Sequence, residues 1–351
     1  MAKLGDIATI QSGGTPARSI AEYWEDGTIP WVKISDIKSK HLNQTEEMIT
    51  EVGLENSSAK IFPKGTILYT IFATLGETSI LEINAATNQA IAGISITDSR
   101  VLPDYLYYYL LSQKIHVQKI GRGVAQNNIN MKLLRDFDVP LPSKEAQLNI
   151  IEQLNQVTEL LFLRKQQLTK LDELIKARFV ELTENVNTVP TRMGDIATYI
   201  NGYAFKPTDW KESGLPIIRI QNLNDATARY NYFDGKIDSK YLVTTGDILV
   251  SWATHLEAYI WNGNRAWLNQ HIFKVLFNKI PINKIYFVYA TEDALRQAFK
   301  NAHGFKPTME HIKRSDFENA IVKLPPMEIQ NQFAAFVAEV DKSKFVGETD
   351  G

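Results

Sequence analysis

The chain has 351 residues, of which 44% are hydrophobic and 22% charged, so we expect a globular protein with room for two domains rather than a disordered one. It contains no cysteine, which excludes disulfides and thiolate metal sites within the chain. The formal net charge of −2 gives no general attraction to nucleic acid, so such binding would need local basic patches or a partner's charges.

The first residues lack the apolar core of a signal peptide. No apolar run approaches the roughly 18 residues that a membrane span needs. We therefore expect a cytoplasmic protein.

Residues 1–142 are predicted to form a first globular domain of mixed α and β structure. Short stretches with alternating apolar residues predict strands, and a longer apolar stretch predicts a helix. The glycines between Gln11 and Pro16 predict a turn. The predicted strands are 29–34, 66–72 and 90–97, and the helix is 103–111.

Residues 143–186 are predicted to form a long spacer helix. Their apolar side chains recur in steps of four and three, which is the pattern of a coiled-coil seam. Ser143 is placed to act as the N-cap, because Pro142 prevents an earlier start. About 40 residues at about 1.5 Å each make a rod of roughly 60 Å, whose apolar stripe must be buried against something. The seam positions are Ile150, Leu154, Val157, Leu161, Leu168, Leu171 and Ile175.

The second part of the chain repeats the first. Leu4-Gly5-Asp6-Ile7 returns as Met193-Gly194-Asp195-Ile196, and further blocks follow in the same order. Residues 187–326 are therefore predicted to form a second domain of the same kind, and 327–346 a shortened second helix. The fold class is α+β, with two similar domains separated by long helices that form an antiparallel coiled coil.

Motifs for catalysis or metal binding are missing from the sequence. It has no phosphate-binding Gly-rich loop, no dinucleotide fingerprint and no nucleophile elbow. A self-contained methyltransferase would need an Asn/Asp-Pro-Pro-aromatic loop, and Leu324-Pro325-Pro326-Met327 lacks both the leading polar residue and the aromatic ring. We therefore predict neither catalytic nor metal-binding residues.

Both domains carry polar, amide-rich loops with basic residues. Arg and Lys bond guanine edges and Asn and Gln bond adenine edges in the major groove, so these side chains are candidates for DNA contact. Asn88-Gln89 and Asn269-Gln270 recur at matched places, so a structural role is at least as well supported for them. The candidates are Gln11, Thr15, Arg18, Lys33, Asn88, Gln89, Arg122, Gln126 and Asn127 in the first domain, and Asn201, Tyr203, Lys206, Arg219, Gln221, Asn222, His255, Asn269, Gln270 and Lys306 in the second.

The ordered combination of blocks resembles the specificity (S) subunit of type I restriction-modification enzymes, and the likeness covers nearly the whole chain. The residues that carry it are Leu4-Gly5-Asp6-Ile7, Ser12-Gly13-Gly14-Thr15-Pro16, Tyr23-Trp24, Ile29-Pro30-Trp31-Val32 and Gly194-Asp195-Ile196, with the helix starts Val139-Pro140-Leu141-Pro142-Ser143-Lys144-Glu145-Ala146-Gln147 and Leu324-Pro325-Pro326-Met327-Glu328-Ile329-Gln330.

This resemblance implies that each domain is a target recognition domain reading one half of a bipartite double-stranded DNA site. It implies that the helices are conserved regions that dock methyltransferase (M) subunits, with the first helix setting the gap between the half-sites. The M subunits would bring S-adenosylmethionine for DNA methylation, and restriction (R) subunits would bring ATP and Mg. The chain itself would need no cofactor and would not be an enzyme.

The short second helix departs from the family pattern. It leaves most of the first helix without an internal partner, so self-association through the seam around Leu161–Ile175 is a further expectation. The alternative function is a helical adaptor or decoy that binds M subunits, or another copy of itself, without reading DNA alone.

Overall fold

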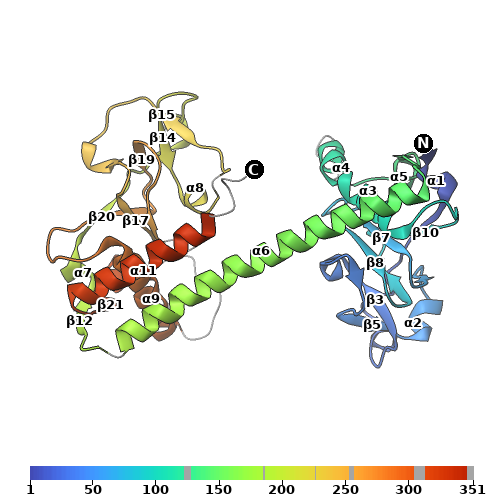
Figure 1. Cartoon of the computed structure of the whole chain (residues 1–351), viewed down its shortest axis with the longest axis horizontal. Helices are drawn as coiled ribbons and strands as arrows, with labels where there is room; N and C mark the ends of the chain where they lie inside the picture. Colours follow the sequence, from blue (N-terminus) through green and yellow to red (C-terminus); the bar gives the residue numbers. More distant parts are fainter. Residues whose placement is uncertain (122–127, 185, 226, 253–256, 304–312, 346–351) are drawn as a thin grey trace. The chain divides into compact units, whose positions relative to one another are not determined.

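A computed structural model describes residues 1–121, 128–184, 186–225, 227–252, 257–303 and 313–345 (Figure 1). The chain divides into two compact units, Met1–Leu163 and Arg164–Gly351. Helix α6 (Lys144–Glu184) gives its first half to the first unit and its second half to the second. Within the described ranges, no helix combines the length and the apolar character needed to cross a bilayer.

Two larger sheets and a two-stranded ribbon build the first unit. The five-stranded sheet has the order β2-β10-β7-β8-β4, the four-stranded sheet has the order β5-β3-β9-β6, and β1 pairs with β11. The strands are β1 (Ala2–Lys3), β2 (Ala8–Ser12), β3 (Ile29–Val32), β4 (His41–Leu42), β5 (Glu47–Ile49), β6 (Ile61–Phe62), β7 (Ile67–Thr70), β8 (Thr78–Leu81), β9 (Ala85–Thr87), β10 (Ile91–Ile96) and β11 (Asp138–Val139). The helices are α1 (Leu4–Ile7), η1 (Ala21–Tyr23), η2 (Ile34–Asp36), α2 (Glu51–Glu55), α3 (Pro103–Ser112), α4 (Lys114–Gly121) and α5 (Met131–Arg135).

The second unit repeats this plan. Its sheets have the orders β13-β20-β17-β18 and β15-β14-β19-β16, and β12 pairs with β21. The strands are β12 (Val189–Arg192), β13 (Thr198–Asn201), β14 (Leu215–Ile218), β15 (Asn231–Phe233), β16 (Leu242–Val243), β17 (Ile248–Ser251), β18 (Ala258–Ile260), β19 (Ala266–Leu268), β20 (Ile272–Leu276) and β21 (Ile321–Leu324). The helices are α7 (Met193–Ile196), η3 (Pro207–Asp209), α8 (Ile220–Asn224), η4 (Ser239–Tyr241), α9 (Lys284–His303), α10 (Arg314–Asn319) and α11 (Met327–Phe345).

A central strand is buried on both faces in each unit. In β7, Ile67 and Tyr69 join one apolar cluster while Leu68 joins another. In β17, Ile248 and Leu249 divide between two clusters in the same way. Successive side chains of a strand point to opposite faces, so each of these strands lies between two cores. The matched pattern confirms the predicted pair of mixed α/β domains.

A buried glutamine near the start of α6 binds that helix to the first unit, and another near the start of α11 binds that helix to the second unit. Gln147 of α6 accepts a hydrogen bond from the Leu102 backbone N–H at 3.0 Å and donates to the Arg100 and Pro142 carbonyls at 2.9 and 3.0 Å. In α11, Gln330 accepts from the Asn283 N–H at 3.0 Å. These bonds explain why the glutamine recurs at both helix starts in the sequence.

The start of α6 agrees with the prediction from sequence. The hydroxyl of Ser143 accepts a hydrogen bond from the Ala146 N–H at 3.3 Å, and its carbonyl accepts from the Gln147 N–H at 2.9 Å. The described helix then runs without interruption for 41 residues. Ser143 is therefore the N-cap, and the predicted long helix is confirmed.

Helix α11 lies antiparallel to the second half of α6 (Figure 1). Phe179 meets Phe333 with ring centroids 5.4 Å apart, while the earlier residue Asp172 pairs with the later residue Lys344 at 2.8 Å. Arg164 donates to the Lys344 carbonyl, so α11 reaches back to the first residue of the second unit.

The two halves of the predicted seam differ in exposure. Leu171 packs against the second unit's core and Ile175 is buried, whereas Leu161 is 67% exposed. The expected self-association surface from Leu161 to Ile175 is therefore wrong in its later part, because the second unit covers it. The exposed apolar side chains of the first half are Leu148, Ile150, Leu154, Val157, Leu160, Leu161, Phe162 and Leu163.

Candidate nucleic-acid interface

Two glycines place the candidate loops of both units at the same point of the fold. The N–H of Gly13 donates to the Ile91 carbonyl at 3.1 Å, and that of Gly202 donates to Ile272 at 3.1 Å. A Cβ on Gly13 would lie 2.1 Å from the Thr87 hydroxyl, so only glycine fits. The close approach brings the loop after β2 or β13 against the turn that begins at Asn88 or Asn269.

Asn88 and Asn269 support this shared geometry. Their backbone N–H groups donate to the carbonyls of Val32 and Ile218 at 3.0 and 3.1 Å. The amide oxygen of Asn88 also accepts from the Ala90 N–H at 3.0 Å. The Asn88 side chain therefore has a structural role at its turn, which was one of the two interpretations left open by the sequence, while Asn269 shares the backbone geometry.

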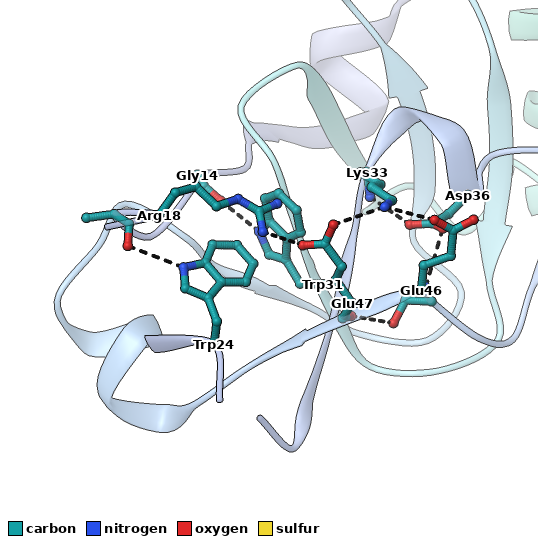
Figure 2. A network of polar contacts seen from close by, with 10 residues as sticks. Gly14, Arg18, Trp24, Trp31, Lys33, Asp36, Glu46 and Glu47 are labelled. Carbon is teal, nitrogen blue, oxygen red and sulfur yellow. Dashed lines mark hydrogen bonds and ion pairs between the residues drawn. The ribbon is translucent and has the colours of Figure 1, made fainter. Parts of the chain in front are cut away.

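In the first unit, Arg18 lies in a cradle of two tryptophans (Figure 2). Its guanidinium carbon is 3.6 Å from the ring centroid of Trp24 and 4.9 Å from that of Trp31, and the two rings meet edge to face. Trp31 donates its indole N–H to the Gly14 carbonyl at 3.0 Å. Arg18 is therefore held by cation–π contacts with the two tryptophans and by an ion pair with Glu47.

Glu47 also reaches Lys33, so the two basic side chains share one carboxylate. The Lys33 ammonium lies 2.8 Å from Glu46 and 2.9 Å from Glu47, and these hydrogen bonds raise the pKa of Lys33. Arg18 first and Lys33 second lower the pKa of Glu47, and Lys33 lowers that of Glu46. We call Arg18, Lys33, Glu46 and Glu47 the carboxylate clamp; its charges cancel.

The second unit uses the position of Lys33 differently. Lys33 and Arg219 both precede a short helix, and their N–H groups donate to Asp36 at 2.9 Å and to Asn222 at 3.1 Å. The guanidinium of Arg219 lies 5.4 Å from the ring centroid of Trp210, so Arg219 has the chain position of Lys33 and the aromatic contact of Arg18.

Asn222 is 5% exposed, and its amide donates to the carbonyls of Ala228 and Arg229 at 3.2 and 3.3 Å. This side chain therefore stabilises its own loop. Burial leaves it poorly placed for DNA contact.

The remaining candidates are engaged in contacts with neighbouring side chains, exposed, or outside the described residues. Thr15 donates its hydroxyl to Gln89, and Tyr203 packs edge to face on Phe205 and Tyr241, so these residues tie loops together. Gln270 shares a 3.0 Å hydrogen bond with His271. The exposed candidates are Gln11, Asn201, Lys206 and Gln221, and those outside the described residues are Arg122, Gln126, Asn127, His255 and Lys306.

Sequence reasoning missed the residues that control these basic side chains. Trp24 and Trp210 follow the short helices η1 and η3, and Glu47 and Asn231 lie on the strands that pair with β3 and β14. The Tyr23-Trp24 pair is visible in the sequence, but the contact between Trp24 and Arg18 arises only from the folding of the loop that joins them. In the described parts of the chain, no group of three or more His, Asp or Glu could hold a metal ion.

Comparisons with known proteins identify relatives of the whole chain. The family model described as the type I restriction modification DNA specificity domain matches residues 1–173 and again 185–346. The MjaIX specificity subunit of Methanocaldococcus jannaschii is 26% identical over 378 residues, which span 95% of this chain and 85% of that protein. The EcoBI specificity subunit of Escherichia coli is 28% identical over 158 residues, 43% of this chain and 33% of its own length. A solved structure that concerns the complex assembly and conformational transition of the type I restriction-modification system has the same fold, with a TM-score of 0.54. Its sequence is 16% identical, and the match covers 98% of this chain and 90% of that one.

Proposed function

The chain belongs to the family of type I restriction-modification DNA specificity domains and is a specificity subunit with two target recognition domains, and from that premise we propose how the two are used. Each unit reads one half of a bipartite double-stranded DNA site through the loops around Gly13 or Gly202. The chain itself performs no chemistry, and it determines the DNA sequence specificity of a methyltransferase complex.

The observation that carries this proposal is a shared frame with different loops. The sheets, the two glycines and the asparagine turns repeat between the units. Between these fixed points the side chains differ in charge and shape, as at Lys33 and Arg219. Such divergence on a constant scaffold is what two readers of different short sequences need, because base edges are read by individual side chains.

The first half of α6 supports a second role, the docking of M subunits. Leu160, Leu161 and Phe162 are 65%, 67% and 59% exposed, and contiguous exposed apolar surface of this kind marks protein contacts. Earlier in the same helix, Asn155 accepts from the Tyr108 hydroxyl at 2.6 Å, which holds α6 on the first unit. M subunits docked here would supply S-adenosylmethionine and phosphate contacts, and R subunits would supply ATP and Mg.

The proposal is tested by exchanging one loop. The segment between β13 and β14 is replaced by the corresponding segment of another family member, and the methylated motif is determined by methylation-aware sequencing with the M partner. Only one half of the motif should change, because the units read independently. A change in both halves would refute independent reading.

The exposed seam also favours the alternative of an adaptor that binds M subunits or a second copy of this chain. Light scattering over a range of concentrations tests self-association: a dimer that disappears on substitution of Leu161 and Phe162 by Ser supports it. DNA binding measured with and without the M subunit separates an adaptor from a reader. An adaptor would leave the M subunit's sequence preference unchanged.

A further inference from the structure

The two units differ in charge at one matched pair of positions. In the first unit, Trp31 of β3 lies opposite Glu47 of β5, and in the second, Ile217 of β14 lies opposite Asn231 of β15. Since Trp31 and Ile217 are equivalent in the repeat, Asn231 occupies the position of Glu47. Directly opposed residues of an antiparallel pair lie on the same face of the sheet.

This difference decides whether the nearby basic residue is already engaged. Lys33 and Arg219 each follow the paired position by two residues and so share its face. Lys33 is held by two carboxylates, whereas among the described residues no acidic group lies within ion-pair distance of Arg219. The positions corresponding to Glu46 and Glu47 are Tyr230 and Asn231.

Arg219 retains unused donor capacity. Its Nε is buried and has no hydrogen-bond partner among the described residues, and the Nη2 bond to the Arg229 carbonyl is long at 3.5 Å. A guanidinium offers five N–H donors in a planar fork, which matches the two acceptors of a guanine edge.

Trp210 links Arg219 to an open hollow of about 580 Å³. The Trp210 ring lies 5.4 Å from the Arg219 guanidinium, is 40% exposed and lines the hollow. Asn231 lines the same hollow, so a side chain at this position faces any occupant. The other lining residues are Lys211, Glu212, Tyr230 and Tyr232.

We propose that Arg219 is the guanine-reading residue of the second unit and that Asn231 leaves it free to do so, whereas Glu47 occupies the corresponding basic residues of the first unit. The inference rests on the proposed function. Arg18 and Lys33 belong mainly to the carboxylate clamp, so the two units use the matched basic position differently.

The test is the substitution Asn231→Glu, with Asn231→Gln as the matched uncharged control. The full chain and its M partner select from a random-sequence duplex library, and each variant's thermal unfolding is recorded. A glutamate at position 231 should pair with Arg219 as Glu47 pairs with Lys33. We expect about a 5- to 150-fold loss of preference at one guanine of one half-site, an unchanged other half, and a control within about twofold of wild type.

Arg219→Ala provides a second arm that does not depend on how the new glutamate is tolerated, and it should lose the same guanine preference. If both variants fold and keep the wild-type motif, the inference is overturned. It is also overturned if affinity falls equally for every sequence with a shallower salt dependence, because that is the signature of a phosphate contact. A wild type that selects no bipartite motif would instead refute the proposed function.

Discussion

At the scale of single residues, the carboxylate clamp shows how basic side chains on the proposed DNA-reading surface are held in place. Arg18 is fixed by aromatic rings and a carboxylate together, and Lys33 by two carboxylates. An Arg that is already oriented loses less side-chain entropy when it meets a ligand, but it must exchange its ion pair for the new contact. The clamp therefore orders these side chains but lowers their affinity for a ligand, because the ion pairs must be broken first.

The clamp should weaken in acid. The pKa values of Glu46 and Glu47 lie below the usual 4.5, so their contribution to stability is complete above pH 4.5 and is lost as the pH falls through the lowered values. Glu47→Gln should be less stable than wild type in urea unfolding between about pH 6 and 8, and the difference should vanish on acidification. Glu25→Gln, an exposed change in the turn after η1, serves as the control. A difference that persists at low pH would show that Glu47 acts through packing.

Candidate residues were only partly predictable at this scale. Composition singled out Arg18, Lys33 and Arg219 because their types suit DNA, and the repeat matched Lys33 with Arg219. It could not indicate Glu47 or Asn231, since their importance arises from strand register. Asn222 was selected for its amide, but the amide is used by its own loop.

At the scale of elements, the helix starts are the best example of a pattern that the sequence displays and only the structure explains. Pro142 and Ser143 predicted where α6 begins, and periodicity predicted its length. The recurring glutamines Gln147 and Gln330 were visible as part of the repeat without a reason. Each accepts a hydrogen bond from the backbone N–H of the residue just before a helix that is distant in sequence, Leu102 before α3 and Asn283 before α9.

Removing either glutamine should loosen a helix from its unit. Gln147 is fully buried, so Gln147→Ala leaves the Leu102 N–H and two carbonyls without partners and should lower the free energy of unfolding by about 1–3 kcal/mol. Gln330→Ala should act similarly in the second unit. Gln156→Ala, exposed on the same helix as Gln147, should change stability by no more than about 0.5 kcal/mol. Chemical denaturation measures all three, and an equal effect of Gln147→Ala and Gln156→Ala would contradict the assignment.

At the scale of the whole molecule, one uninterrupted helix serves both units. Its second half is covered by α11, and its first half carries exposed apolar side chains. Periodicity predicted one continuous seam, but it could not show that the seam changes from buried to exposed, because that depends on where α11 ends against α6. We propose that this helix is the spacer that sets the gap between two half-sites.

Inserting seven residues after Glu159 tests that claim most directly. One heptad adds about 10 Å, roughly three base pairs, and changes the facing of the helix by only about 20°. The methylated motif of the wild type and of the insertion variant, each with the M partner, is read by methylation-aware sequencing. The account predicts two unchanged half-sites separated by a longer gap. A motif with an unaltered gap would contradict it.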